Sequence, residues 1–180
     1  MRKFICRAAQ KVHKTLILSR FHKAIDPYNV LFLGDSISFV LGGKYNLARP
    51  GLPSDELLDH LKTADYRSAV ANAGIVSILI GTNDLWQRRT QLNENLRKLD
   101  HLLPDQPIIW NGLCNSWPFD FAEIDRANDT IQRIVEGRTN SIYLHSPLAS
   151  KRDFLADGVH LSARGISVWT NALSTVITGK

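Results

Sequence analysis

Short apolar segments that stop at glycine or a polar residue alternate with amphipathic segments, and this alternation is the feature that most constrains the fold. The segment 29–33 (NVLFL) stops at Gly34, and the segment 76–80 (VSILI) stops at Gly81. Apolar runs of this length are typical of strands that are buried on both faces. Further strands are predicted at 107–111 (PIIWN), 141–145 (SIYLH) and, with a weaker pattern, 45–48 (YNLA).

The amphipathic segments between these runs predict helices at 52–64, 85–102, 121–136 and 161–177. Strands separated by helices pair in parallel, and the helices then cover both faces of the sheet. The sequence therefore predicts a three-layer α/β/α domain with a five-stranded, parallel, flavodoxin-like sheet. The carboxyl ends of the strands meet at one edge of such a sheet, where ligands bind.

The composition fits one soluble globular domain with a short appendage. The chain has 180 residues, of which 44% are hydrophobic and 22% charged, so a sizeable core needs no disulfide framework. Its two cysteines, Cys6 and Cys114, are too few and too distant to suggest one, and no Cys/His cluster has zinc spacing.

The net charge of +5 comes from the N-terminus. Residues 1–25 hold seven of the 22 Lys and Arg and no acidic residue, so the rest of the chain has 15 basic against 17 acidic residues. The body shows no basic stripe with interleaved aromatic residues, so nucleic-acid binding is not indicated. We interpret 1–28 as a basic helical extension and 29–180 as the folded domain.

The extension has neither a continuous apolar signal-peptide core nor an apolar stretch of membrane-spanning length, so we expect a cytoplasmic protein. Two interpretations of residues 1–25 remain. The segment is either a basic amphipathic helix on an anionic membrane surface or a helix packed on the domain. In the second case residues 4–5 and 16–18, Phe21 and Ile25 are buried. We favour packing.

Polar residues follow the predicted strands at the edge where ligands bind. Ser36 follows the first strand, Gly51 the second and Asn83 the third, while Asp157 and His160 follow the fifth. Acyl transfer from an ester needs a nucleophile, a base, a group that orients the base, and donors for the oxyanion. These five residues supply groups of each kind.

The same residues resemble the SGNH, or GDSL, hydrolases. The segment FLGDSIS (32–38) resembles the family's first block, Asn46 and Gly51 the second, IGTND (80–84) the third and DGVHLSARG (157–165) the fourth. The resemblance implies the SGNH hydrolase fold, with Ser36 as nucleophile, His160 as base and Asp157 as the group that orients it. It also implies an oxyanion hole formed by the backbone N–H groups of Ser36 and Gly51 and the side-chain amide of Asn83.

Simpler roles compete with these assignments. Ser36 and Asp157 are each suitable helix N-caps, and Asp84 is expected to anchor its loop. Trp86, Trp117 and Phe119 follow the third and fourth strands and either line the substrate pocket or close the core. Arg88 and Arg89 either meet an anionic leaving group or lie on a solvated helix face, which we favour.

We therefore expect a serine hydrolase that cleaves carboxylic esters through an acyl-enzyme, without a metal ion or organic cofactor. The expected partner is a small-molecule ester with a small or medium acyl group. Carbohydrate O-acetyl esters, lipid esters and thioesters all remain candidates. The alternative is a non-catalytic binding protein, or a membrane-associated protein, that retains the hydrolase fold.

Overall fold

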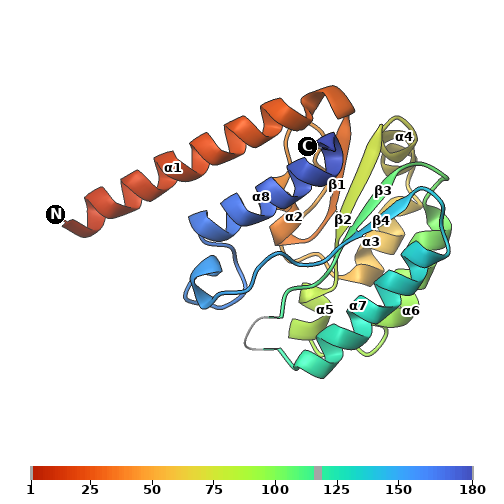
Figure 1. Ribbon diagram of the computed structural model, residues 1–180. Helices are drawn as coiled ribbons and strands as arrows, with labels where there is room; N and C mark the ends of the chain where they lie inside the picture. Colours follow the sequence, from red (N-terminus) through yellow and green to blue (C-terminus); the bar gives the residue numbers. More distant parts are fainter. Residues whose placement is uncertain (1, 116–118, 180) are drawn as a thin grey trace.

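A parallel sheet lies at the centre of the computed structural model, which describes residues 2–115 and 119–179, with side chains from residue 14 onward (Figure 1). Its four strands are arranged in the order β1-β2-β3-β4, and every neighbouring pair is parallel. This confirms the predicted parallel α/β architecture. The strands are β1 (Val30–Gly34), β2 (Ile75–Leu79), β3 (Ile108–Asn111) and β4 (Ser141–Leu144).

Helices cover both faces of the sheet (Figure 1). On one face α8 lies against the sheet with α1 beside it, and on the other α3, α6 and α7 pack against one another. The α-helices are α1 (Arg2–Ile25), α2 (Ser36–Leu41), α3 (Ser54–Leu61), α4 (Ala64–Ala71), α5 (Thr82–Trp86), α6 (Leu92–Leu102), α7 (Phe121–Glu136) and α8 (Ala163–Thr178), and two short 3₁₀ helices are η1 (Asp26–Tyr28) and η2 (Lys151–Asp153).

The predicted fifth strand at 45–48 is wrong, because this segment forms only an isolated parallel bridge between Asn46 and Phe32. The Phe32 N–H donates to the Tyr45 carbonyl, and the Leu47 N–H donates to the Phe32 carbonyl. The segment therefore lies along the free edge of β1, where the expected strand would lie. Because the segment pairs with β1 at a single residue, it does not form a strand.

Two predicted helices are shorter in the structure than in the prediction. The segment 52–64 contains α3, and α4 follows it at Ala64 as an additional helix that the sequence analysis did not predict. The segment 85–102 is divided into α5 and α6. At the break Arg88 adopts a left-handed conformation with φ 54°, and the Arg89 N–H donates to the Asp84 carbonyl.

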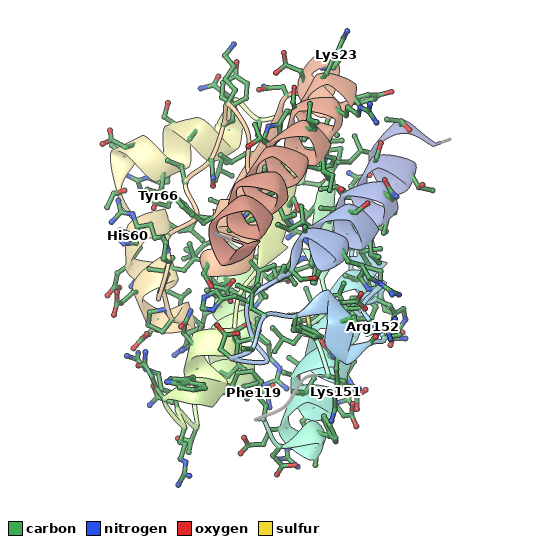
Figure 2. All side chains as sticks on the ribbon, turned by 90° about the vertical axis from the view of Figure 1, so that its left-hand side faces the viewer. Lys23, His60, Tyr66, Phe119, Lys151 and Arg152 are labelled. Carbon is green, nitrogen blue, oxygen red and sulfur yellow. The ribbon has the colours of Figure 1, made fainter. Side chains whose placement is uncertain are left out.

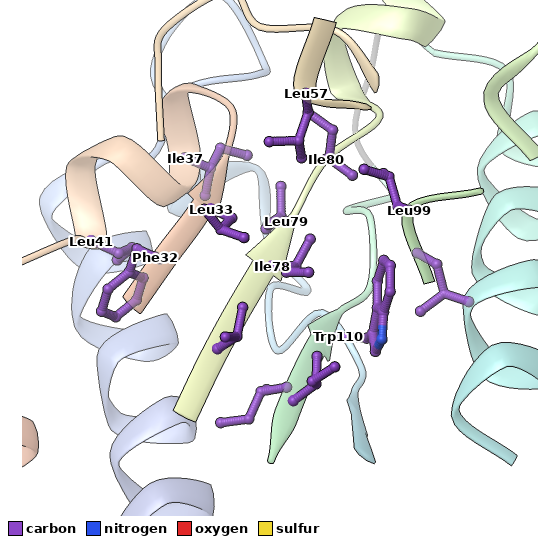
Figure 3. Close-up of a cluster of buried hydrophobic side chains, with 14 of the residues drawn as sticks. Phe32, Leu33, Ile37, Leu41, Leu57, Ile78, Leu79, Ile80, Leu99 and Trp110 are labelled. Atoms are coloured by element: carbon purple, nitrogen blue, oxygen red, sulfur yellow. The ribbon is translucent and has the colours of Figure 1, made fainter. Parts of the chain in front are cut away.

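The core forms on both faces of the sheet from side chains that alternate along each strand (Figure 3). Leu33, Ile78 and Trp110 are neighbours in register, and Figure 3 shows them together with Leu99 of α6. Phe32 faces the other way, and its ring meets that of Phe21 edge to face at a centroid distance of 6.3 Å. The core therefore extends from α6 through the sheet to α1.

The second half of α1 is packed on the domain. Phe21 and Ile25 are buried, Ile17 and Leu18 are partly buried against the core, and α1 lies along α8 (Figures 1 and 2). The predicted burial of Leu16 is wrong, because its side chain is 53% exposed, and residues 4–5 lie outside the described side chains. A His22 Nε2···Leu41 carbonyl hydrogen bond of 2.9 Å joins α1 to the end of α2. Among the described residues, no helix combines the length and apolar content needed to cross a membrane.

Candidate functional site

Ser36 lies at a sharp turn between β1 and α2. Gly34 has a φ of 124°, and a Cβ at this position would overlap the Leu79 carbonyl oxygen, so the turn requires glycine. Asp35 is the N-cap of α2, because its carboxylate accepts from the Ile37 N–H at 3.0 Å. Ser36 is therefore the first residue of the helix and not its cap. Its N–H has no acceptor within α2, which leaves this donor at the carboxyl edge of the sheet.

Asp35 is fully buried beneath this turn, and burial raises the pKa of its carboxyl from 3.8 to about 6. Hydrogen bonds from the Ile37 N–H and from Thr82 act in the opposite direction, and the nearby Asp84 adds to the rise in the pKa. The carboxyl supports the turn from inside the protein.

A closed loop between β4 and α8 carries Asp157 and His160. Phe154 and Leu161 form an antiparallel bridge, and the Leu155 N–H donates to the His160 carbonyl at 2.7 Å. Ser162 is the N-cap of α8, because its Oγ accepts from the Gly165 N–H. Asp157 therefore does not cap this helix, and its carboxylate serves the loop instead.

Asp157 binds the imidazole of His160 directly. Its Oδ2 lies 2.9 Å from His160 Nδ1, and its Oδ1 accepts the N–H groups of Val159 and His160 at 2.9 Å each. Partial burial raises the pKa of the Asp157 carboxyl, but these hydrogen bonds outweigh burial and lower it below its usual value. Because Nδ1 is engaged, Nε2 is the ring nitrogen available to another group.

Ser36 and His160 line the same cavity, whose volume is about 160 Å³. Within the described part of the chain no hydrogen bond joins the two side chains, so proton transfer needs a rearrangement that brings them together. Such loosened geometry is common in unliganded active sites. The cavity is lined by Lys14, Ser36, Ile37, Val40, Leu155, His160 and Leu161.

Gly51 and Asn83 lie on two loops that are joined by a hydrogen bond. Asn83 Nδ2 donates to the Leu52 carbonyl at 3.1 Å, and Gly51 has a φ of 78° with open space around its Cα. An asparagine amide has two N–H donors, so the bond to Leu52 uses one and leaves the other. The loop after β2 and the loop before α3 are thereby held at a fixed separation.

A buried network beneath these loops fixes them further. The Asp84 carboxylate accepts from the Ser54 N–H at 2.9 Å and from Ser54 Oγ at 2.5 Å, and Asn95 Nδ2 donates to Ser54 Oγ at 2.9 Å. Burial raises the pKa of Asp84, while both bonds from Ser54 oppose the rise. Asp84 anchors its loop in the structure, as the sequence suggested.

Trp86 and Phe119, which the sequence placed either in the substrate pocket or over the core, do not line the cavity of Ser36 and His160. Trp86 is 62% exposed at the end of α5, and its ring meets that of Phe119 edge to face at 6.2 Å. Trp117 lies outside the described residues.

Lys14 is a charged residue of this cavity that the sequence motifs did not indicate. It belongs to α1, which is far in sequence from every matched block, and the prediction for residues 1–25 concerned their cations only as a group. The spacing of Lys14 from the apolar residues of α1 could have indicated that it faces the domain. Lys14, Leu18, Phe21 and Ile25 follow one another at intervals of four, three and four residues, which places them on one helix face.

Comparison with solved structures shows the fold. A Streptococcus pneumonia protein named after platelet activating factor matches with a TM-score of 0.64 and 18% identity, over 98% of each chain. A family 3 carbohydrate esterase of Clostridium thermocellum matches with a TM-score of 0.62 and 18% identity, over 92% of this chain and 87% of that one. A protein of Slackia heliotrinireducens assigned to the SGNH hydrolases matches with a TM-score of 0.58 and 15% identity, over 81% and 96%.

No protein-family model and no curated protein matches the sequence. The structural matches nevertheless confirm the predicted SGNH hydrolase fold. The first match extends through most of α1, since it leaves only 2% of this chain uncovered.

Proposed function

We propose that this chain, which has the SGNH hydrolase fold, is a serine hydrolase that cleaves carboxylic esters through an acyl-enzyme. One observation carries the proposal. Ser36 and His160 are far apart in the sequence but line one cavity, and the carboxylate of Asp157 lies within hydrogen-bond distance of His160 Nδ1.

In the proposed reaction His160 Nε2 takes the proton of Ser36 Oγ as that oxygen attacks the ester carbonyl carbon. The C–O bond to the alcohol then breaks, and the alcohol leaves with the proton from His160. Water activated by the same imidazole hydrolyses the acyl-enzyme. Asp157 fixes the tautomer of His160 and stabilises its protonated form.

The oxyanion hole of the proposal consists of the N–H groups of Ser36 and Gly51 and the free N–H of the Asn83 amide. Each side of this hole has structural support. The Ser36 N–H lies at the start of α2. The hydrogen bond from Asn83 Nδ2 to the Leu52 carbonyl joins the loop of Asn83 to the loop of Gly51, and these loops carry the other two donors. Donors fixed before the reaction stabilise the charged intermediate without reorganisation.

The size of the cavity favours small or medium acyl groups. A second cavity of about 670 Å³ shares Leu155 with it and includes the apolar side chains of Phe121, Leu148 and Phe154. This adjoining space supports acyl groups longer than acetyl within the same class. Carbohydrate, lipid and thioester substrates all remain within the proposal.

A non-catalytic binding role is the competing proposal, and the Asp157–His160 pair argues against it. A binding site for a neutral ester has no use for an imidazole whose Nδ1 is held by a carboxylate. The catalytic proposal requires this arrangement.

The test is hydrolysis of 4-nitrophenyl esters of increasing acyl length beside acetylated sugars, by the wild type and by Ser36→Ala. The variant should retain the melting temperature and lose about 10⁴–10⁶-fold in kcat. Equal turnover by both proteins would eliminate Ser36 as the nucleophile, and absence of turnover by the wild type on every ester would favour the binding role.

A further inference from the structure

We infer that Lys14 is a specificity residue that binds an anionic group of the substrate, so that the preferred esters carry a carboxylate or phosphate near the scissile bond. This inference rests on the proposed hydrolase function. It assigns to α1 a part in substrate selection.

The position of Lys14 on α1 is the first support. Ile25, Phe21 and Leu18 form the inward face of the helix, and Lys14 is the next residue on that face. An apolar residue would continue the packing there. The sequence instead places a cation where this face reaches the cavity of Ser36 and His160. The same spacing continues in the sequence to Lys11 and Arg7.

The attachment of α1 keeps Lys14 at the cavity. His22 binds the Leu41 carbonyl at the end of α2, and the ring of Phe21 meets that of Phe32 in β1. Since α2 begins with Ser36, the helix that carries the lysine is fixed to the helix that carries the proposed nucleophile. These contacts fix α1 relative to α2 and β1, and Lys14 and Ser36 line the same cavity.

No described side chain neutralises the charge of Lys14. Among the described residues it has no ion-pair or hydrogen-bond partner, although it is half-buried. Asp157 is engaged at both oxygens by His160 and Val159. Arg89, by contrast, is paired with Asp55 and has no free charge to offer a substrate.

The surroundings of Lys14 make an anion its natural ligand. Ile37, Val40, Leu155 and Leu161 supply apolar walls, which strengthen a charge interaction relative to one in open water. A carboxylate or a phosphate oxygen would satisfy the ammonium in a way that an uncharged acyl chain or a sugar hydroxyl does not. The ester selected by this cavity is therefore an anionic one.

The test uses two pairs of esters that differ by one charge. Mono-4-nitrophenyl glutarate and 4-nitrophenyl pentanoate share the leaving group and acyl length, and place the charge on the acyl side. The 4-acetoxybenzoate anion and its methyl ester place the charge on the leaving side. Both pairs are hydrolysed by the wild type, Lys14→Met, Lys14→Arg and Lys23→Met.

Lys14→Met retains the apolar stem and removes the charge, whereas Lys14→Arg retains the charge. Lys23→Met is the matched control, because Lys23 is exposed on the same helix, and Figure 2 shows it at the opposite end of the molecule from Phe119 and Lys151. Lys14→Met should lower the anionic-to-neutral ratio of kcat/KM about tenfold in one of the pairs, mainly through KM. Lys14→Arg and Lys23→Met should stay close to the wild-type ratio.

A binding measurement separates this inference from the proposed function. Titration calorimetry compares the affinities of Ser36→Ala and Ser36→Ala/Lys14→Met for mono-4-nitrophenyl glutarate and for the Lys14-independent 4-nitrophenyl pentanoate. Loss of affinity for the anionic ester alone supports the inference, even if the wild type hydrolyses no ester. Unchanged ratios in both pairs, equal loss on both members of each pair, or equal affinities of the two binding variants would overturn it.

Discussion

Asp35 immediately precedes the proposed nucleophile and has no exposed surface. Burial raises its pKa from 3.8 to about 6, so the folded chain holds the proton more tightly than the unfolded chain. Folding therefore takes up a proton between these two values, and the stability that depends on this residue falls as the pH rises through that window. A shift of about two units corresponds to roughly 3 kcal/mol.

Asp35→Asn should remove this pH dependence, because asparagine retains an acceptor for the Ile37 N–H and carries no charge. Urea unfolding at pH values below 4 and above 6 measures the effect. The free energy of unfolding of the variant relative to the wild type should increase with pH, by up to roughly 3 kcal/mol. Parallel pH profiles for the two proteins would contradict a raised pKa of this buried carboxyl.

Asn83 is assigned to the oxyanion hole, and its removal should act on kcat. Asn83→Ala should lower kcat by about 10²–10³-fold with little change in KM, because the amide acts mainly on the charged intermediate. Steady-state kinetics on one 4-nitrophenyl ester measures both constants. A rise in KM together with a lower melting temperature would instead mean that Asn83 only holds the Leu52 loop.

At the scale of the elements, α3 and α5 are joined by the buried bonds between Ser54 and Asp84. Ser54→Ala removes one of the two bonds that stabilise the Asp84 carboxylate and leaves Asn95 without its acceptor. We expect a loss of about 1–3 kcal/mol in stability, because buried polar groups become unpaired.

The same substitution should also lower kcat, since the loops of Gly51 and Asn83 lose part of their support. Glu56→Ala on the exposed face of α3 is the control and should change neither quantity. Chemical denaturation and ester kinetics on both variants test the coupling. Loss of stability with full kcat in Ser54→Ala would show that the network supports the fold and not the site.

The periodicity of apolar residues predicts some of the helices and strands but not all of their boundaries. The buried strands and the amphipathic α7 were predictable, because their apolar residues repeat with a clear period. The break between α5 and α6 was not, since it depends on the left-handed conformation of Arg88, which nothing local requires. The segment at Asn46 has a strand-like sequence but pairs with Phe32 at one position only. The number of residues that pair with β1 depends on neighbours that are distant in the sequence.

For the whole molecule, the packing of α1 against α8 favours one of the two interpretations of residues 1–25, and deletion of this segment tests it. Deletion of this segment removes Phe21 and Ile25 from the core, so the melting temperature should fall. Phe21→Ala in the full chain should cost about 3–5 kcal/mol for the same reason. Calorimetry measures both.

Flotation with anionic liposomes at low salt completes this test, and the packing interpretation predicts that the intact protein does not bind. Salt-sensitive binding by the intact protein, combined with an unchanged melting temperature after deletion, would establish a membrane-surface helix instead.

The whole-molecule arrangement also explains which part of the candidate site was predictable. Ser36, Asn83 and the Asp157–His160 pair follow β1, β2 and β4, and parallel strands end at the same edge, so topology predicts that they lie at that edge. Gly51 follows the bridged segment at Asn46, which is not a strand. Lys14 comes from a helix outside the sheet. Its place at the cavity depends on how α1 packs against α2 and α8, which the charge of residues 1–25 does not reveal.

Covalent labelling of Ser36 tests the central claim most directly. A fluorophosphonate reacts with a serine only where a base activates the hydroxyl and donors stabilise the charged adduct. Peptide mass spectrometry should find one adduct on Ser36 in the wild type and almost none in His160→Ala, with both proteins folded. An adduct on another serine, or an unlabelled Ser36 in a protein that hydrolyses esters, would contradict the assignment.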